Sequence, residues 1–264
     1  MSTSTENQKR ATVVGATPEG AKDREAAARA VREMFTSIAP RYDLLNHILS
    51  FNVDRTWWRR TARNFGAVLI RPGARLLDLC CGTGDMSFAL LREAKNKGGL
   101  PLVLGADFSH AMLQRAKTKG QGTGIRWVEG DALRLPLASD SVDLVTAAFG
   151  FRNLADYDAG LSEIYRVLRH SGEVGILDFG EPKGLMGSLY RGYFRHVLPK
   201  LGTMISGVKG PYAYLPASVA RFPAPEEILG RMRDIGFHYV SWTPYTFGIA
   251  GLYRGKKGKV SGDV

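Results

Sequence analysis

The strongest constraint on the fold of this chain is a repeating pattern between residues 75 and 179, where short apolar segments alternate with helical ones. Strands are predicted where the apolar runs are short, at 75–81, 102–107, 125–129, 142–149 and 173–179. Helices are predicted between them, at 84–95, after a cap at Ser109, and from 161 until Gly172 ends the last one. Strands joined by crossover helices favour a mainly parallel sheet with helices on both faces, so the predicted class is α/β.

Further elements are predicted on both flanks of this core. Three helical stretches precede it, over 27–38 with Pro40 as its end, over 44–49, and after a cap at Asp54. A long helical pattern at 185–205, a helix at 226–235 and strands near 237–242 and 246–253 follow it.

These elements predict one folded domain between two tails. The expected boundaries are a disordered tail at 1–20, a single domain at 21–255 and a basic tail at 256–264. Within the domain we expect N-terminal helices at 21–70 and a basic helical insertion at 183–225.

Composition is that of an ordinary globular protein and limits the cellular compartments in which the protein is expected. Of 264 residues, 44% are hydrophobic and 23% are charged, which is enough for a large core. No apolar run reaches the roughly 18–20 residues that span a bilayer, and the polar start lacks a secretory apolar segment. Cys80 and Cys81 are adjacent, which favours neither a disulfide nor a metal site. We therefore expect a cytoplasmic protein without a metal.

The formal net charge is +11, and one long stretch lacks acidic residues. Residues 183–225 contain no Asp or Glu, and their Lys and Arg residues are interleaved with Tyr and Phe. Such a surface attracts anionic lipid head groups or nucleic acid. The pattern at 185–206 has an apolar face with basic edges, which fits either a helix in the lipid interface or ordinary core packing.

The first candidate site is the run L-L-D-L-C-C-G-T-G-D at 76–85, where a strand turns into a helix. Gly82 and Gly84 allow a ligand to approach the backbone closely, and Asp107 at the end of the next strand is placed to accept both hydroxyls of a ribose. Ser87 stands where a dinucleotide fingerprint needs its third glycine. The acidic neighbours Asp78 and Asp85 favour a ligand with an amino group and a sulfonium over one with two phosphates.

Two more candidates follow the third and fourth predicted strands. In G-D-A-L-R-L-P-L at 130–137, Asp131 and the Ala132 backbone are placed to bind an adenine; an ordinary acidic turn is the alternative. In A-A-F-G-F-R-N-L at 147–154, Arg152 and Asn153 are expected to point into a pocket at the carboxyl ends of the strands; a surface loop is the alternative.

These runs, together with M-F-T-S-I-A-P-R-Y-D-L-L-N-H-I-L-S at 34–50 and Y-L-P-A-S-V-A-R-F-P at 214–223, resemble the ubiquinone/menaquinone biosynthesis C-methyltransferases. The resemblance implies a class I S-adenosylmethionine-dependent methyltransferase with a Rossmann-like, mostly parallel seven-stranded sheet, N-terminal helices and a helical insertion before the last strands. The family's cofactor positions fall on Thr83, Asp107, Asp131 and Ala132, beside Gly82 and Gly84. The chain departs from the general pattern at Cys80, where a first glycine is common.

The resemblance also implies methylation of a ring carbon on a prenylated quinol. Arg152 is then expected to stabilise the phenolate, and Asn153 and Tyr42 to orient the ring oxygens, with Asn46 and His47 as weaker candidates. The preferred acceptor is demethylmenaquinol, and the alternative is a polyprenyl-benzoquinol of ubiquinone biosynthesis. The expected partners are the quinol and, transiently, an anionic membrane on the inner face of the cell, with no nucleic acid; a homodimer stays open.

Three other functions fit parts of the sequence. The basic charge allows a nucleic-acid methyltransferase, although the chain has no Asn/Asp-Pro-Pro-Tyr motif. A non-catalytic binding module is a second alternative, opposed by the intact glycine turn with Asp107 and Arg152. An NAD-dependent oxidoreductase is a third, opposed by the missing glycine at Ser87.

Overall fold

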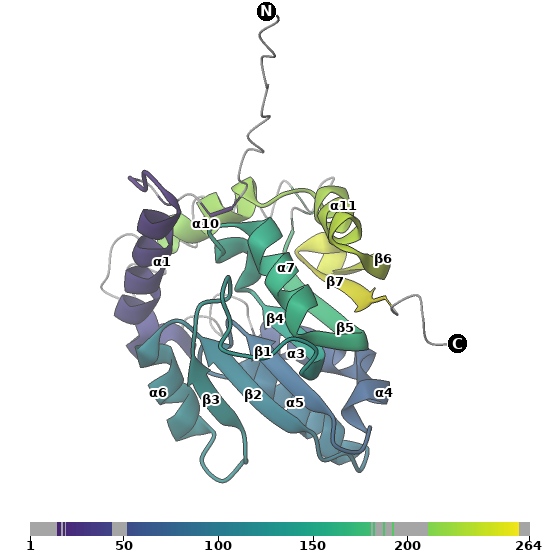
Figure 1. Cartoon of the computed structure of the whole chain (residues 1–264). Helices are drawn as coiled ribbons and strands as arrows, with labels where there is room; N and C mark the ends of the chain where they lie inside the picture. The colour runs from purple at the N-terminus through teal and green to yellow at the C-terminus, as the bar shows by residue number, and fades with distance from the viewer. Residues whose placement is uncertain are drawn as a thin grey trace, which may run out of the picture.

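A twisted seven-stranded sheet forms the centre of the protein in its computed structural model, which describes residues 15–16, 18, 20–43, 52–180, 182, 187, 192 and 211–258 (Figure 1). The strand order is β3-β2-β1-β4-β5-β7-β6. The strands are β1 (Arg75–Leu79), β2 (Leu102–Asp107), β3 (Arg126–Glu129), β4 (Val142–Ala148), β5 (Leu168–Phe179), β6 (Phe237–Tyr245) and β7 (Ala250–Lys257). Strands β1 to β5 pair in parallel, and β7 is antiparallel to both of its neighbours. The predicted mainly parallel α/β sheet is confirmed.

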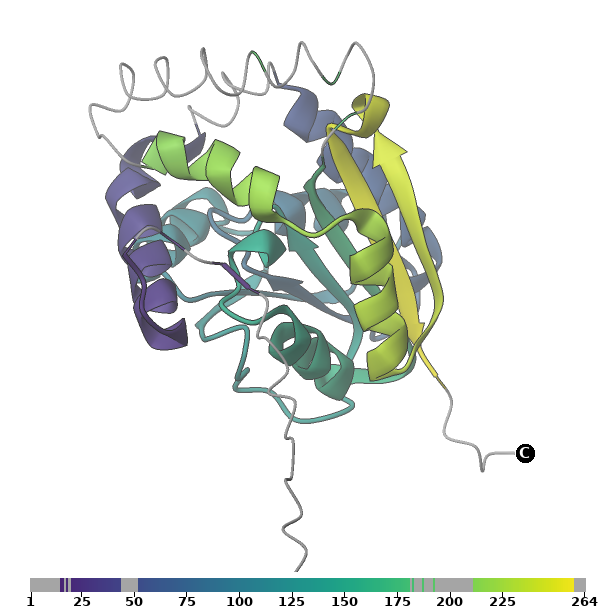
Figure 2. The same ribbon diagram turned by 90° about the horizontal axis from the view of Figure 1, so that it is seen from above.

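Helices cover both faces of this sheet (Figures 1 and 2). Their bounds are α1 (Arg24–Ile38), α3 (Val53–Asn64), α4 (Gly66–Leu69), α5 (Asp85–Asn96), α6 (His110–Lys119), α7 (Tyr157–Val167), α10 (Pro211–Arg221) and α11 (Pro225–Ile235), with short 3-10 turns η1 (Ala39–Arg41), η2 (Phe151–Asn153) and η4 (Thr246–Gly248). Seen from above, α10 crosses the molecule from α1 towards α11 (Figure 2). No helix in the described part of the chain is long and apolar enough to cross a bilayer.

The two faces of the sheet are assigned by the alternation of side chains along each strand. Leu77 and Val145 point to the face that α7 and α11 cover, and they are fully buried there. Their neighbours Leu76 and Leu144 point to the opposite face, against α3, α4 and α5. A parallel strand that is covered on both faces is a nearly continuous apolar run, which explains why β1 and β4 were recognisable from sequence.

The helix cap predicted at Asp54 is wrong, and the cap position predicted at Ser109 is confirmed. Asp54 lies inside the first turn of α3, and the cap position is taken by Asn52 with a φ of 60°. Ser109 does hold the cap position of α6, but its side chain makes no capping hydrogen bond. Its hydroxyl lies 3.2 Å from the Thr36 hydroxyl of α1, so a tertiary contact replaces the local one.

The end of the domain also differs from the predicted boundaries. Helix α7 ends at Val167, and β5 begins at the next residue instead of after Gly172. Strand β7 continues to Lys257, so Lys256 and Lys257 are not part of a basic tail. Lys256 pairs with Glu173 at 3.1 Å and the buried Lys257 pairs with Asp140 at 2.8 Å, which ties the strand end to the domain. The helix expected at 44–49 lies outside the described residues, and so does the helical pattern expected at 185–205 except for residues 187 and 192.

Candidate active site

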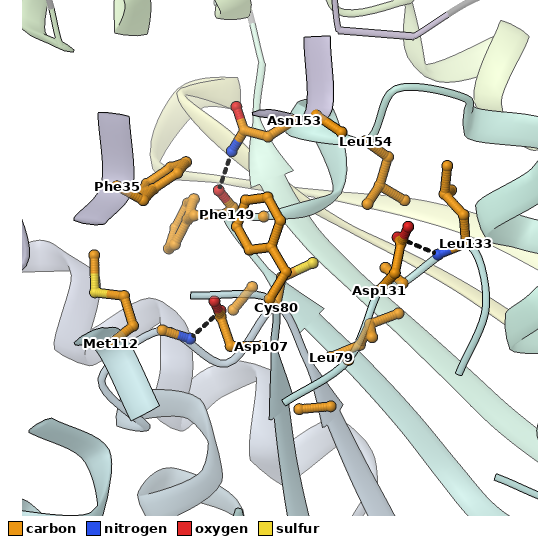
Figure 3. Close-up of a pocket in the computed structure, with 18 of the residues that line it drawn as sticks. Phe35, Leu79, Cys80, Asp107, Met112, Asp131, Leu133, Phe149, Asn153 and Leu154 are labelled. Atoms are coloured by element: carbon orange, nitrogen blue, oxygen red, sulfur yellow. Dashed lines mark hydrogen bonds between the residues drawn. The ribbon is translucent and has the colours of Figure 1, made fainter. Parts of the chain in front are cut away.

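A pocket lies at the carboxyl ends of β1, β2 and β4 and beside the loop after β3, where the strand order reverses (Figure 3). Its lining surrounds about 730 Å³ of space, part of it open to solvent. Apolar side chains dominate its wall, and Phe35 and Tyr42 close it from the N-terminal segment. Open α/β sheets bind ligands at such reversal points because two neighbouring crossovers leave on opposite faces there.

The glycine turn after β1 brings backbone to the pocket wall. Cys80 and Gly82 both adopt left-handed backbone angles, with φ values of 53° and 54°. Gly84, with a φ of 91°, lies at the start of α5 away from the pocket lining, where a Cβ would stand 2.5 Å from the Trp127 ring. Of the two predicted glycines, Gly82 therefore lines the pocket, and Gly84 allows α5 to pack against β3.

Asp107 connects the end of β2 to this turn. Its Oδ2 accepts the Gly82 N–H at 2.8 Å, and its Oδ1 accepts the Ser109 N–H at 2.9 Å. Burial raises the pKa of the Asp107 carboxyl to about 6, although these backbone donors act in the opposite direction. Each carboxylate oxygen retains a lone pair, so the side chain has the acceptors that a diol requires.

Asp131 and Ala132 form the pocket wall next to Asp107. Asp131 Oδ1 accepts the Leu133 N–H at 2.9 Å, which fixes the side chain on the open side of the pocket. Asp131 and Asp107 face one space (Figure 3). Because β2 and β3 pair in parallel, with Asp107 opposite Glu129, the following loop must pass beside the Asp107 carboxyl.

A smaller pocket adjoins the first and shares Tyr42, Cys80, Gly82, Ala148 and Phe149 with it. Thr83 lines this smaller pocket and not the larger one. Its hydroxyl donates to Asp43 Oδ1 at 2.5 Å and accepts from Lys119 Nζ at 3.1 Å. Lys119 also pairs with Asp43 and Asp85, at 2.9 and 3.0 Å. This cluster fastens the N-terminal segment across the glycine turn.

Asp78 lies at the base of the smaller pocket and is fully buried. It accepts hydrogen bonds from the Ser87 hydroxyl at 2.6 Å and from the Thr146 hydroxyl at 3.0 Å. Burial raises the pKa of its carboxyl to about 7. Ser87, which replaces the third glycine of a dinucleotide fingerprint, therefore has a hydrogen-bond partner in the preceding strand β1, and the turn is built around a carboxyl instead of a pyrophosphate.

Arg152 does not point into the pocket as expected. Its guanidinium is buried against Asp178 at the end of β5, with Nη1 2.8 Å from Oδ1, and it also donates to the Phe149 carbonyl. The Asp178 Oδ2 accepts the Arg152 N–H at 2.9 Å. A buried guanidinium needs a counter-charge and acceptors for its donors, and Asp178 supplies them more directly than a solvated pocket would.

Asn153 and Tyr42 do reach the pocket lining. The Tyr214 hydroxyl of α10 donates to Asn153 Oδ1 at 3.1 Å. The Asn153 amide donates weakly to the Phe149 carbonyl at 3.4 Å (Figure 3). Burial raises the pKa of the Tyr214 hydroxyl, so it stays a proton donor. Asn46 and His47 lie outside the described residues.

Sequence reasoning missed several residues of the site. Tyr214 lies in the run Y-L-P-A-S-V-A-R-F-P at 214–223, and the resemblance of that run to the family is the signal that could have indicated it. Nothing in the sequence indicated that Asp178, Asp43 or Lys119 would meet their partners, because each contact joins segments that are distant along the chain.

The residues that converge here fit an adenosine-bearing methyl donor. An apolar cleft, a close backbone approach at Gly82 and two carboxyls on neighbouring strands supply a wall for a base and acceptors for a ribose. The adjoining pocket supplies carboxyls for a cationic group at Asp78 and Asp85. The arrangement has no third glycine for a pyrophosphate, as expected from the sequence.

The chain is similar to known methyltransferases over most of its length. The model of the ubiE/COQ5 methyltransferase family matches residues 21–257. A demethylmenaquinone methyltransferase of Deinococcus radiodurans is 47% identical over 238 residues, which are 89% of this chain and 95% of that protein. One of Thermus thermophilus is 46% identical over 227 residues, 85% of this chain and all of that protein (100%).

Solved structures support the fold independently. A SAM-dependent methyltransferase of Thermotoga maritima superposes with a TM-score of 0.59 at 19% identity, over 86% of this chain and 99% of that one. The class I Rossmann-like architecture is thereby confirmed. With the family match covering the sheet, the pocket and the helix over it, the chain belongs to the ubiE/COQ5 methyltransferase family.

Proposed function

We propose that the protein methylates a ring carbon of a prenylated quinol, with demethylmenaquinol as the acceptor and menaquinol as the product. The two relatives above share nearly half of its residues and are named for demethylmenaquinone. The observation that carries the proposal is that Asp107 of the glycine-turn site and Asn153 of the A-A-F-G-F-R-N-L run line one pocket. A polyprenyl-benzoquinol is the second candidate acceptor.

S-adenosylmethionine, when bound, supplies an electrophilic methyl group on its sulfonium. Asp107 would hold the ribose hydroxyls, and Asp131 with the Ala132 backbone would hold the adenine. Asp78, Thr83 and Asp85 surround the place that the amino-acid end would take, next to Gly82. In-line methyl transfer then depends mainly on how well the protein positions the acceptor and excludes water.

The acceptor carbon gains electron density when the neighbouring phenol loses its proton. Asn153 is placed to stabilise that phenolate, because its Nδ2 carries two hydrogens and only one is directed to the Phe149 carbonyl. Tyr214 fixes the amide in this orientation by donating to its oxygen. Tyr42 faces the same pocket and orients a second ring oxygen. We assign Arg152 a positioning role, because its guanidinium donates to the Phe149 carbonyl and pairs with Asp178.

The proposal is tested by transfer of labelled methyl groups to reduced demethylmenaquinone and, in parallel, to the reduced benzoquinol precursor. Label in the naphthoquinol fraction alone supports the menaquinone assignment, and label in the benzoquinol fraction alone would replace it. Asp107→Ala should abolish cofactor binding, whereas Asn153→Ala should bind S-adenosylhomocysteine normally and lose turnover. No transfer to either quinol by a protein that binds S-adenosylhomocysteine would refute the proposal.

A further inference from the structure

A basic groove runs between α3 and α5, on the face of the sheet opposite α7 and α11. Arg55, Arg59 and Arg63 follow one another at four-residue spacing along α3, so they stand about 6 Å apart on one side of the helix. Arg92 and Lys95 line the groove from α5. All five of these residues are exposed.

The positive charge of this arginine groove is only partly neutralised. Its two acidic residues are already engaged, since Glu93 pairs with Arg63 at 3.8 Å and Asp85 pairs with Lys119 at 3.0 Å. Within the described residues, Arg55, Arg59, Arg92 and Lys95 take part in no ion pair. Four exposed cations without counter-charges along one cleft create a field that attracts anions.

The groove also reaches the active site. Trp58 and Asp85 line both the arginine groove and the smaller pocket beside the glycine turn. Trp57, the neighbour of Trp58 on α3, packs with its ring centroid 5.7 Å from that of Phe149, which lines the larger pocket. An anionic surface that occupies the groove is therefore held next to the pockets.

We propose that the arginine groove docks the protein on a membrane through the phosphates of anionic phospholipids. The choice of a lipid partner rests on the proposed function, because a prenylated acceptor resides in the bilayer. Guanidinium groups match phosphate oxygens in pairs, and a row of them about 6 Å apart can engage neighbouring head groups. Single-stranded nucleic acid is less well served, because it also needs exposed aromatic rings for base stacking, and Trp58 is only 8% exposed.

The test compares two triple variants of the full-length protein with equal charge loss. The groove variant is Arg55→Gln, Arg59→Gln and Arg92→Gln. The matched control is Arg71→Gln, Arg126→Gln and Arg233→Gln, which removes exposed arginines from other parts of the surface. Sedimentation with phosphatidylcholine vesicles, with and without phosphatidylglycerol, measures partitioning at several salt concentrations.

We expect the groove variant to bind phosphatidylglycerol vesicles on the order of a hundredfold more weakly and the control variant to lose much less. Equal losses in the two variants would show that net charge alone determines vesicle binding, and would overturn the proposal. A labelled RNA that loses binding only to the groove variant, while vesicle binding stays unchanged, would assign the groove to nucleic acid instead.

A second readout separates this proposal from the proposed function. With a water-soluble, short-chain demethylnaphthoquinol, the groove variant should keep the turnover of the unmodified protein. With long-chain substrate embedded in phosphatidylglycerol vesicles, its turnover should fall. Absence of turnover on both substrates in the unmodified protein would refute the proposed function and leave the vesicle-binding result valid. Equal loss on both substrates in the groove variant alone would overturn the docking role.

Discussion

At the scale of single residues, Cys80 shows how the site accommodates a departure from the general motif. It takes a left-handed conformation with a φ of 53°, which costs a residue with a Cβ about 1–2 kcal/mol. Gly150 faces it, and a Cβ added there would stand 2.3 Å from the Cys80 Cβ. Because Gly150 has no side chain, it leaves the space that the Cys80 side chain occupies.

This pairing predicts coupled effects on the free energy of unfolding. Gly150→Ala should destabilise by about 1–3 kcal/mol through overpacking, since the φ of −109° at Gly150 suits any residue. Cys80→Gly alone should stay within about 1 kcal/mol, because relief of strain offsets the added chain entropy of glycine. The double variant should regain most of the loss in denaturant unfolding. Gly230→Ala, with open space around it, is the control, and purely additive losses would contradict the pairing.

Asp107 predicts a pH-dependent affinity for the cofactor. Its carboxyl must be ionised to accept two ribose hydroxyls, and burial raises its pKa to about 6. The Kd for S-adenosylhomocysteine should therefore decrease as the pH rises through about 6 and level off above. In the free protein the sign is opposite, because a raised pKa stabilises the fold at low pH and this stability is lost as pH rises through about 6. Calorimetric titration of the Asp107→Asn variant should show a flatter profile; an unchanged profile would assign the titration elsewhere.

At the scale of elements, the site is closed by segments that the sheet itself does not contain. The Tyr42–Asp43 segment crosses the glycine turn, and α10 rests on η2 through the Tyr214–Asn153 bond and through Ser218, whose hydroxyl lies 3.4 Å from Arg152 Nε. Lys119 at the end of α6 joins the first of these closures to the glycine turn through three acceptors.

The Lys119 cluster predicts faster release of the cofactor when it is broken. Asp43→Asn or Lys119→Met should raise the dissociation rate of S-adenosylhomocysteine on the order of tenfold, because the Tyr42–Asp43 segment is no longer fastened. Global stability should change by less than about 1 kcal/mol, since both side chains are about one-third exposed. Stopped-flow measurements give the rates, and the control is Lys97→Met, which breaks the pair with the buried Glu93 and lies outside the lining of both pockets. Unchanged rates in both variants would exclude a fastening role.

The Arg152–Asp178 pair predicts a loss of stability in addition to a loss of turnover. Arg152→Met leaves the buried Asp178 carboxylate without its partner, which should cost about 3–5 kcal/mol in thermal or denaturant unfolding. Adding Asp178→Asn should restore most of that stability. The restored double variant should bind S-adenosylhomocysteine and turn over slowly, because the Phe149 carbonyl has lost its anchor. Full turnover in the double variant would refute the positioning role.

At the scale of the whole molecule, the two covered faces of the sheet stabilise the fold, and the ends of its parallel strands carry the proposed active site. The apolar layers between the sheet and its helices hold the strands in register, with α7 and α11 on one face and α3, α4 and α5 on the other. The residues proposed to bind the donor and acceptor all gather at one edge, where the parallel strands end. The arginine groove lies on the α3–α5 face and meets this edge at Trp58 and Asp85.

Sequence pattern alone predicts the strands that alternate with helices, the glycine turn, and the positions of Asp107, Asp131 and Ala132 around one pocket. These features follow from local periodicity and from the rule that parallel strands end at the same edge. The folded structure was needed to see that Arg152 pairs with Asp178, that Tyr214 reaches Asn153, and that Lys119 pairs with Asp43. Charged and polar side chains pair with the groups that folding brings near them, and no periodicity along the chain encodes contacts between segments so far apart.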